Sequence, residues 1–302
     1  MYCKIRKYWT GADNRMKQMG FLGPLGTHSE AAAIYLKGMV PEKYELVPCA
    51  NIYEAIHQVE QGRLDSCLVP VENSIEGSIN ITLDTLAGSD NLQVVRELIW
   101  HVHNNLMMRS DIGEDVPVKR ILSHSQPLSQ CRQFIRCNYP LAEQEAVAST
   151  AMAAKLVAEA APTDGWAAIC TRRGGELNGL KLVAENIEDL PNNSTRFYQL
   201  IRRDSKENTD YGQPEKSLII CQIDGKDAGR LCEILTELAD RQVNLTRIES
   251  RPARTGLGEY IFFLDVEMPE HRWQLEEALA GIRQRSIWLR QPGEFPTINA
   301  DN

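Results

Sequence analysis

The chain has 302 residues, 43% of them hydrophobic and 25% charged, with a formal net charge of -8. This length is enough for two domains with sizeable cores, and the composition is that of a globular protein. The acidic balance argues against a nucleic-acid binder, because no basic surface is left to neutralise phosphates, and no apolar run is long enough to predict a membrane span.

The N-terminal residues 1–18 are basic but lack the apolar segment of a secretory signal, so we interpret them as a short extension. The eight cysteines form no CxxC pair, and several lie inside apolar, strand-like runs such as "LIICQI". Reduced, buried thiols of this kind are typical of a cytoplasmic protein, and we expect that location.

Strand-like and helix-like segments alternate from Gly20 onward. "GFLGP" leads into "THSEAAAIYL", in which Thr27 and Glu30 have the spacing of a capping box. The next helical segment, "NIYEAIHQVEQG", places apolar side chains on one face, namely Ile52, Ala55, Ile56 and Val59. The strand-like "LDSCLVP" follows, and "RILSH" and "EAVAS" each precede a further helical segment. This alternation predicts an α/β architecture with largely parallel sheets.

The pattern changes after "IRRDSKENTDYGQPEK", a polar stretch that we predict to be a linker. Beyond it come a strand, a helix, two strands, a helix and a short strand, which is the ferredoxin-like βαββαβ order. The first helix of this part carries apolar residues at helical spacing, namely Leu231, Ile234, Leu235 and Leu238. The open edges of such a sheet favour pairing with a second copy.

Hydroxyl and amide side chains gather at four junctions between a strand and a helix: "GPLGTHSE", "PVENSIEGS", "SHSQP" and "ASTA". Helix N-termini carry unpaired N–H donors and bind anions, and strand ends meet at one edge of an open α/β sheet. Together with Thr195 and Arg196 of "NNSTRFYQL", these junctions predict an anion site. Each junction alone is more often a helix cap than a ligand contact, so the capping alternative stays open.

Other candidate motifs are weaker. His101 and His103 would share a face of a strand, but no third metal ligand has a recognisable spacing, so we predict no metal site. "FLGPLG" lacks the glycine spacing of a dinucleotide-binding turn.

The quoted motifs "GPLGTHSEAA", "VPVENSIEGSIN", "SHSQPLSQC", "STAMAA" and "NSTRF" occur in the order found in prephenate dehydratases. The segment "GRLCEIL" and the later "NLTRIESRPARTGLGEYIFFLDVE" resemble the ACT regulatory domain of that family. The resemblance runs from about Gly20 to about Arg290. It implies a two-lobed catalytic domain similar to a periplasmic binding protein, with the active site between the lobes, followed by a ferredoxin-like ACT domain.

The resemblance also implies the domain boundaries. These are an extension at 1–18, a catalytic domain at 19–203, a linker at 204–215, an ACT domain at 216–291 and a tail at 292–302. Within the catalytic domain, lobe 1 would comprise about 19–98 and 180–203, and lobe 2 about 99–179. We expect no fused chorismate mutase, because residues 1–18 are too few to form one.

The implied reaction converts prephenate to phenylpyruvate in phenylalanine biosynthesis, with loss of water and carbon dioxide and without metal or organic cofactor. Prephenate is a dianion with a ring hydroxyl, so it needs anion donors at two places and a proton donor near the hydroxyl. By resemblance, Thr195 lies nearest the reacting atoms. Its hydroxyl is a poor acid at neutral pH, so we expect it to donate a hydrogen bond to the leaving oxygen. Arg196 points the opposite way on a strand and is a weaker catalytic candidate, whereas Phe197 shares the face of Thr195 and is expected beneath the ring.

The expected substrate contacts are Thr27, Asn73, Ser74, Gln126, Ser149 and Thr150. Glu72 is expected to orient neighbouring donors. L-Phenylalanine is implied as an allosteric effector that binds between two ACT domains, in a homodimer or homotetramer. The expected walls of that site are Gly229, Arg230, Leu231, Glu249, Ser250, Arg251 and Pro252. Alternatively, Gly229 only permits close packing at a helix start and Glu249–Pro252 only ends a strand.

The chain departs from the usual family pattern at several positions. His28 stands where an aromatic residue is common, Ser125 where a proline is common, and Asn104 where a histidine is often found. Arg230 occupies a place usually held by a smaller or apolar residue. Two alternative functions remain open, an arogenate dehydratase and a non-catalytic amino-acid-sensing binding protein, although the intact "STRF" favours an enzyme.

Overall fold

The computed structural model describes residues 16–113, 115–205, 210–225, 228–256 and 258–300. Most of the expected N-terminal extension and residues 206–209 of the expected linker therefore lie outside the described residues. Within the described ranges, no helix is both long enough and apolar enough to cross a membrane.

The first lobe is built on a seven-stranded sheet of order β16-β5-β11-β3-β1-β2, with β4 paired to β3. Its strands are β1 (Lys17–Leu22), β2 (Tyr44–Cys49), β3 (Ser66–Asn73), β4 (Gly77–Ser78), β5 (Leu92–His101), β11 (Ser194–Arg202) and β16 (Thr297–Asn299). Its helices are α1 (His28–Met39), α2 (Ile52–Glu60) and α3 (Asn80–Gly88). β1 runs parallel to β2 and β3, whereas β11 runs antiparallel to both β3 and β5. The face predicted for α2 is buried as expected.

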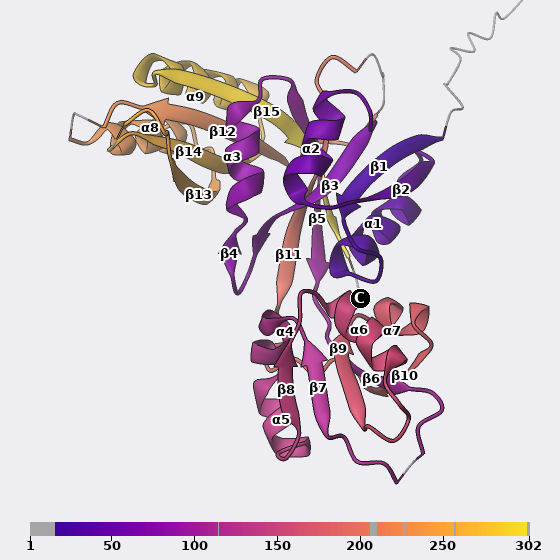
Figure 1. Cartoon of the computed structure of the whole chain (residues 1–302). Coiled ribbons are helices and arrows are strands. Elements are labelled where there is room, and N and C mark those ends of the chain that lie inside the picture. The colour runs from indigo at the N-terminus through magenta and orange to yellow at the C-terminus, as the bar shows by residue number, and fades with distance from the viewer. Residues whose placement is uncertain (1–15, 114, 206–209, 226–227, 257, 301–302) are drawn as a thin grey trace, which may run out of the picture.

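The second lobe contains a five-stranded sheet of order β10-β6-β9-β7-β8. Its strands are β6 (Asn105–Arg109), β7 (Arg120–Ser123), β8 (Glu143–Ala146), β9 (Trp166–Cys170) and β10 (Leu180–Ala184). Its helices are α4 (Ser125–Gln130), α5 (Arg132–Asn138), α6 (Thr150–Glu159) and α7 (Arg172–Leu177). Two stretches of chain join the lobes, one between β5 and β6 and one between β10 and β11 (Figure 1).

The expected lobe boundaries differ from the structure at β10. We expected residues 180–203 to return to lobe 1, but β10 pairs antiparallel with β6 in the sheet of lobe 2. The cause is apolar packing, because Leu180 is buried in the same core cluster as Ala153 and Val157 of α6. Only β11 returns to lobe 1.

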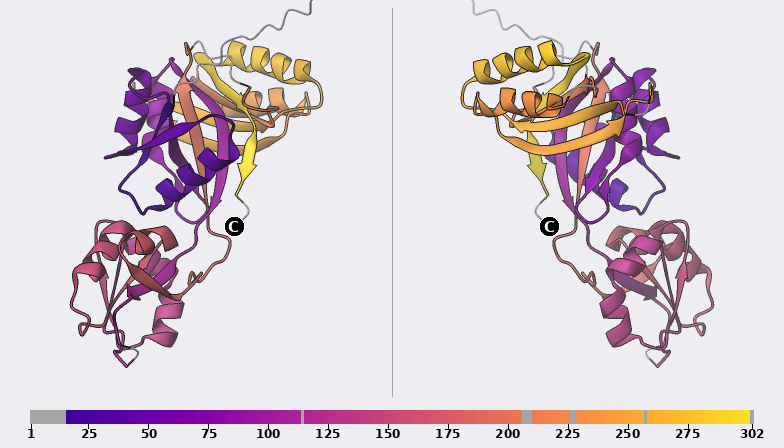
Figure 2. Two further views of the ribbon diagram at one scale, coloured as in Figure 1. Left: turned by 90° about the vertical axis from the view of Figure 1, so that its right-hand side faces the viewer. Right: turned by 90° about the vertical axis from the view of Figure 1, so that its left-hand side faces the viewer.

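A C-terminal domain, residues Lys216–Phe295, follows with the predicted βαββαβ order. Its sheet has the order β13-β14-β12-β15. The elements are β12 (Lys216–Ile223), α8 (Arg230–Ala239), β13 (Leu245–Pro252), β14 (Tyr260–Glu267), α9 (Arg272–Arg285) and β15 (Trp288–Phe295). Figure 2 shows this sheet between its own helices and lobe 1.

The two faces of that sheet belong to two different cores. Ile219, Cys221 and Leu264 pack against α8 and α9. The alternate residues Leu218 and Ile220, on the opposite face, lie in one cluster with residues of lobe 1, among them Val69, Val94, Tyr198 and Leu200. The C-terminal domain is therefore packed onto the sheet of lobe 1.

The residues that we expected to form a tail, 292–302, contain strand structure in the part that is described. β15 continues to Phe295, and β16 then joins the lobe 1 sheet by pairing parallel with β5. Ala300 is fully buried there. The open edge of β5 offers free backbone donors and acceptors, and the end of the chain satisfies them.

Candidate active site

Thr195 and Asn73 lie side by side at the end of lobe 1, as cross-strand partners on β11 and β3. Asn73 Nδ2 donates a hydrogen bond to Thr195 Oγ1 at 2.9 Å. The amide is held in this orientation because Asn73 Oδ1 accepts from the backbone N–H groups of Ile75 and Glu76, each at 3.0 Å. The Thr195 oxygen therefore acts as an acceptor toward Asn73, and its own proton is left to be donated elsewhere.

A chain of amide side chains continues from this pair into lobe 2. Asn193, almost fully buried, accepts from Asn73 Nδ2 at 2.9 Å and donates to Gln130 Oε1 at 3.1 Å. The same Gln130 oxygen accepts from Asn104 Nδ2 at 3.4 Å. Asn193 and Gln130 were not among the expected site residues, although they lie inside the motifs "NSTRF" and "SHSQPLSQC". Gln126, an expected substrate contact, is exposed one helical turn before Gln130 on α4.

Ser74 ties the loop after β3 to the start of β11. Its Oγ donates to the carbonyl of Asn192 at 3.2 Å and accepts from the N–H of Ser194 at 2.9 Å. Ser194 Oγ in turn lies 3.0 Å from Nδ1 of His101. Ser74 therefore belongs to the framework of the site, and its hydroxyl is already engaged.

Three helix N-termini come together where the lobes touch. Thr27 caps α1 by accepting from the N–H of Glu30 at 3.3 Å, and Ser149 caps α6 by accepting from Met152 at 3.0 Å. Thr171, which caps α7, donates from Oγ1 to the carbonyl of Gly26 at 2.8 Å and so joins the lobes. The capping interpretation is thus confirmed for Thr27 and Ser149. These contacts bring the N-termini of α1, α6 and α7 close together, as an anion site requires.

Ala151 and Gly174 also belong to that contact, and Thr150 precedes Ala151 on α6. Thr150 is buried as the first residue of α6. An added Cβ on Gly26 would meet the Ala151 Cβ at 3.7 Å and Gly174 Cα at 2.9 Å, so the backbones of the two lobes approach closely here.

His28 and Asn104 place unsatisfied polar atoms between the lobes. His28 Nε2 and Asn104 Oδ1 are both buried without a hydrogen bond in the described structure. Burial lowers the pKa of His28 to about 4, against the opposing effects of Asn104 and Glu188, so the ring is neutral at pH 7. His103 Nδ1 lies 2.7 Å from Glu188 Oε1, and the N–H of Asn104 donates to Glu188 Oε2 at 3.0 Å.

Arg196 and Phe197 do not face the site. The Arg196 guanidinium contacts Glu72 at 2.8 Å and Asp265 of the C-terminal domain at 2.7 Å, on the side of the sheet opposite Thr195. Phe197 is 1% exposed and packs in the lobe 1 core with Phe21. The expectations of Phe197 beneath a ligand ring and of Arg196 as a catalytic group are therefore not met by the structure, because side chains alternate along β11 and Phe197 is enclosed by its own core. The Glu72 carboxylate pairs with Arg196 and Arg247, on the face of the sheet opposite the Asn73 side chain.

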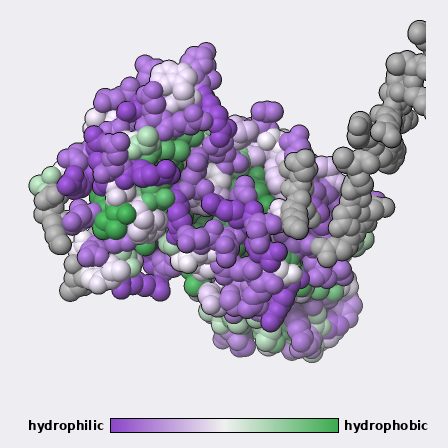
Figure 3. Space-filling view, turned by 90° about the horizontal axis from the view of Figure 1, so that it is seen from above, coloured by the Kyte–Doolittle hydropathy of each residue, from purple (hydrophilic) through white to green (hydrophobic). Residues whose placement is uncertain are grey.

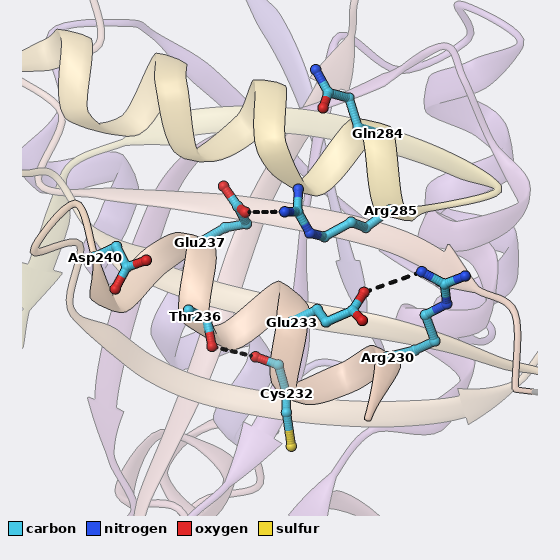
Figure 4. Close-up of a pocket in the computed structure, with 8 residues that line it drawn as sticks. All are labelled: Arg230, Cys232, Glu233, Thr236, Glu237, Asp240, Gln284 and Arg285. Atoms are coloured by element: carbon cyan, nitrogen blue, oxygen red, sulfur yellow. Dashed lines mark hydrogen bonds and ion pairs between the residues drawn. The ribbon is translucent and has the colours of Figure 1, made fainter. Parts of the chain in front are cut away.

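The expected regulatory residues form two groups, one at the start of α8 and one at the end of β13. Both groups lie at the same end of the C-terminal sheet, because Tyr260 pairs with Ile223, the last residue of β12 before α8, and with Pro252, the last residue of β13. Gly229 precedes α8 with a φ of 90°, a conformation that favours glycine. Leu231 packs against the domain core. Arg230 Nη1 lies 3.1 Å from Glu233 Oε2 beside a hollow between α8 and the end of α9 (Figure 4).

The second group alternates along β13. Glu249 accepts a hydrogen bond from Ser78 at 2.6 Å, and Arg251 Nε pairs with Asp84 Oδ1 at 2.9 Å, so both contact lobe 1. Ser250 and Pro252 are exposed. None of these four residues lines the hollow of Figure 4, which is formed by residues of α8 and α9 and by Asp240, the C-cap of α8.

Comparison with known proteins places this geometry in context. The sequence model of a family described as prephenate dehydratase matches residues 19–205, and that of the ACT domain matches residues 219–284. The prephenate dehydratase of Methanocaldococcus jannaschii is 36% identical over 277 residues, which cover 91% of this chain and 97% of that protein.

Two solved structures have similar folds. A prephenate dehydratase from Arthrobacter aurescens in complex with L-Phe has a TM-score of 0.79 and 32% identity, over 92% of this chain and 90% of that one. A structure described as a quorum quenching acylase has a TM-score of 0.78 and 25% identity, over 93% of this chain and 98% of that one. Since similar folds carry different described activities, the fold alone does not select a reaction, and the residues of the site must do so.

Proposed function

Because the chain belongs to the prephenate dehydratase family, we propose that it converts prephenate to phenylpyruvate and that phenylalanine regulates it through the C-terminal ACT domain. The observation that carries the proposal is the hydrogen bond from Asn73 Nδ2 to Thr195 Oγ1 at 2.9 Å, which leaves the threonine proton available. No other hydroxyl at the junction of the lobes has its oxygen held in this way by a side-chain amide whose own orientation is set by the backbone, among the described residues.

The chemistry requires little more than placement and a hydrogen bond. The electron pair of the bond to the ring carboxylate moves into the ring as carbon dioxide leaves, and the ring hydroxyl leaves from the opposite carbon. One proton from solvent turns the departing hydroxide into water, so prephenate dianion plus a proton gives phenylpyruvate anion, carbon dioxide and water. Thr195 stabilises the charge that develops on the leaving oxygen by donating its hydrogen bond.

The helix N-termini supply donors for the carboxylates. Ser149 Oγ accepts from Met152, which leaves its proton for a ligand, and Thr150 follows it at the start of α6. We assign these two residues to one carboxylate of the substrate. The hydroxyl of Thr27, across the lobe contact, already donates to the Pro24 carbonyl at 3.0 Å, so Thr27 serves this site as the cap of α1. The amide of Asn73 acts through Thr195, because it orients the threonine hydroxyl that is to donate to the ring hydroxyl.

Regulation by L-phenylalanine is supported by the ACT match and by the L-Phe complex of the similar structure. We propose that two ACT domains pair through β13. The opposite edge strand, β15, lies against lobe 1, where Gly293 approaches the Val94 carbonyl, whereas β13 leaves Ile248 43% exposed. Figure 3 shows hydrophobic side chains at the surface on the left, the side of this domain. A homodimer or a tetramer of such dimers follows. The free cysteines support a cytoplasmic location.

The decisive assay offers prephenate and, separately, arogenate to the purified protein, with and without L-phenylalanine, and follows the aromatic product by absorbance. Thr195→Ala is expected to lower kcat by about a hundredfold, whereas Thr195→Ser, which keeps the hydroxyl, retains most activity. Preference for arogenate would identify the related dehydratase. Absence of product from both compounds, or near-normal turnover by Thr195→Ala, would contradict the proposal.

A further inference from the structure

Charged side chains from six different strands meet between lobe 1 and the C-terminal domain. Lobe 1 contributes two acids and one base, and the C-terminal domain contributes one acid and two bases, so the two sides carry opposite net charge. We call this set the interdomain charge cluster; it comprises Glu72 (β3), Glu97 (β5), Arg196 (β11), Lys216 (β12), Arg247 (β13) and Asp265 (β14).

Arg196 occupies the centre of the cluster. Its Nη1 lies 2.8 Å from Glu72 Oε2, its Nε 2.7 Å from Glu97 Oε1 and its Nη2 2.7 Å from Asp265 Oδ2. The other Asp265 oxygen accepts from the Tyr198 hydroxyl at 3.1 Å, and both Asp265 and Glu97 are fully buried. Burial by itself lowers the pKa of Arg196, but the oxygens of Tyr198, Asp265 and Glu97 raise it above its ordinary value, so the guanidinium stays charged.

On β11 and on β3, the cluster residue is the immediate neighbour in sequence of a residue of the candidate active site. Arg196 pairs with Glu72, and the adjacent Thr195 pairs with Asn73. Because successive side chains of a strand point to opposite faces, one pair faces the substrate side and the next faces the C-terminal domain. A displacement of the Arg196–Glu72 pair therefore moves the backbone that carries Thr195 and Asn73.

We propose that Asp265 is a positioning residue for the dehydration: it anchors the Arg196–Glu72 pair from the C-terminal domain and thereby fixes where Thr195 and Asn73 stand. The inference rests on the proposed catalytic role of Thr195. It gives the C-terminal domain a part in the reaction even when no effector is bound. The alternative, that the cluster only joins two domains, predicts altered stability with an unaltered active site.

The test is a double-mutant cycle between Asp265→Asn and Thr195→Ala with prephenate as substrate. Asp265→Asn keeps the shape and removes the charge, so kcat is expected to fall by about ten- to a hundredfold, while KM changes by less than about threefold. In the Thr195→Ala background the same change is expected to lower kcat by less than about twofold, because its effect passes through Thr195. Equal losses in both backgrounds, or an unchanged kcat, would overturn the proposal.

Two further variants keep the outcome decisive. Asp90→Asn is the matched control, since Asp90 pairs with Arg290 at 2.9 Å across the same two domains but is 85% exposed and outside the cluster; it is expected to retain wild-type kcat. If Asp265→Asn does not fold, Tyr198→Phe removes only the hydroxyl that holds Asp265 Oδ1. A smaller fall in kcat, again absent in the Thr195→Ala background, is then expected, and an unchanged kcat contradicts the proposal.

A readout without substrate separates this inference from the proposed function. In the free protein, the ¹⁵N side-chain amide signal of Asn73 reports its hydrogen bond to Thr195. Asp265→Asn is expected to shift that signal and Asp90→Asn to leave it in place. If the wild-type protein converts neither prephenate nor arogenate, the proposed function fails, while the Asn73 signal still decides whether Asp265 positions the pair. An unshifted signal in a folded Asp265→Asn variant rejects the inference alone.

Discussion

The orientation of one side-chain amide decides what the candidate catalytic hydroxyl can do. Asn73 presents its NH₂ group to Thr195 because two backbone N–H groups already occupy its oxygen. If an oxygen stood in place of that nitrogen, it would accept the Thr195 proton, which would then not be available to the substrate. The hydroxyl is thus prepared as a donor before the substrate arrives.

We expect Asn73→Asp to lower kcat/KM for prephenate by about a hundredfold or more, and Asn73→Ala to have a smaller effect, about tenfold. The carboxylate would draw the Thr195 proton toward itself, whereas alanine only removes the support. Asn192→Asp introduces the same charge at an exposed neighbouring position and is expected to stay near wild type. Similar kinetics for Asn73→Asp and Asn192→Asp would refute the assigned orientation.

A second residue-scale prediction concerns pH. The pKa of His28 is about 4 in the folded protein and near 6.5 when unfolded, so the unfolded state binds the proton more readily. Stability is therefore unaffected above pH 6.5 and decreases as pH falls from 6.5 toward 4, by up to about 3 kcal/mol. The groups that face the ring are Asn104, Glu188 and His103.

Urea denaturation at pH 7 and pH 4.5 measures this effect. His28→Phe is expected to lose less stability than wild type between the two values, since it has no imidazole to protonate. His57→Gln, at a histidine whose side chain is 44% exposed, is the control and should follow wild type. Equal losses for all three proteins would show that His28 is not the titrating group.

Part of the site was predictable from single residues, and part was not. Thr195 and Asn73 lie in motifs that place hydroxyl and amide groups at strand termini, which is a local signal: Asn73 ends β3 and Thr195 lies at the start of β11. Asn193 and Gln130 act through amide contacts between segments far apart in sequence, and no spacing rule encodes such contacts. The expectation that Phe197 lies beneath a ligand ring is wrong. Alternation along a strand predicts which face a side chain lies on, but not whether that face is open to a ligand or covered by the core.

At the scale of elements, the lobes meet through backbone at the starts of α1 and α7. The carbonyl of Gly26 accepts from Thr171, and an added Cβ on Gly174 would stand 2.6 Å from that carbonyl oxygen. Only glycine leaves room for this approach. The contact sets how near the capped helix N-termini of the two lobes stand to each other.

Gly174→Ala is expected to separate these helix starts, lowering kcat/KM for prephenate by about tenfold or more and stability by about 1–3 kcal/mol. Gly38→Ala is the matched control, because Gly38 lies in α1 with nothing within 4 Å of an added Cβ; it should be neutral or slightly stabilising. Kinetics and thermal unfolding of both variants check the expectation. Full activity in Gly174→Ala would show that the lobe contact does not matter for catalysis.

The elements themselves were largely readable from the sequence. The α2 face and the caps Thr27 and Ser149 follow from apolar periodicity and from the preference of hydroxyls for helix starts. We expected β10 in lobe 1 and a tail at the residues of β16, because the sequence of a short strand does not indicate which sheet it joins. Their partners, β6 and β5, are specified by tertiary packing.

At the scale of the whole molecule, the polar stretch before Lys216 predicts a linker between two domains, yet the sheets of the two domains share a core. One signal was present in the sequence: "SLIICQI" is apolar without alternation, which is typical of a strand buried on both faces. The interdomain charge cluster at the same interface adds specificity, since the two sides carry opposite net charge.

Pairing through the open β13 edge is tested by Ile248→Lys, which is expected to shift the molar mass by size-exclusion light scattering from dimer or tetramer toward monomer and to abolish the response to L-phenylalanine. Ile287→Lys places the same charge at another exposed isoleucine of this domain, 58% exposed, and should leave the assembly intact. Unchanged masses for both variants would exclude β13 as the contact.

The place of β16 has a consequence for how the molecule is made. Residues 297–299 pair with residues 97–99, so the first sheet gains its last strand only after the C-terminal domain has left the ribosome. Contacts between segments so far apart in sequence slow folding, because the entropy of closing a long loop is lost before the strand pairing lowers the free energy. During synthesis the edge of β5 stays open, and nascent chains on crowded polysomes have a template for mispairing until residues 297–299 emerge.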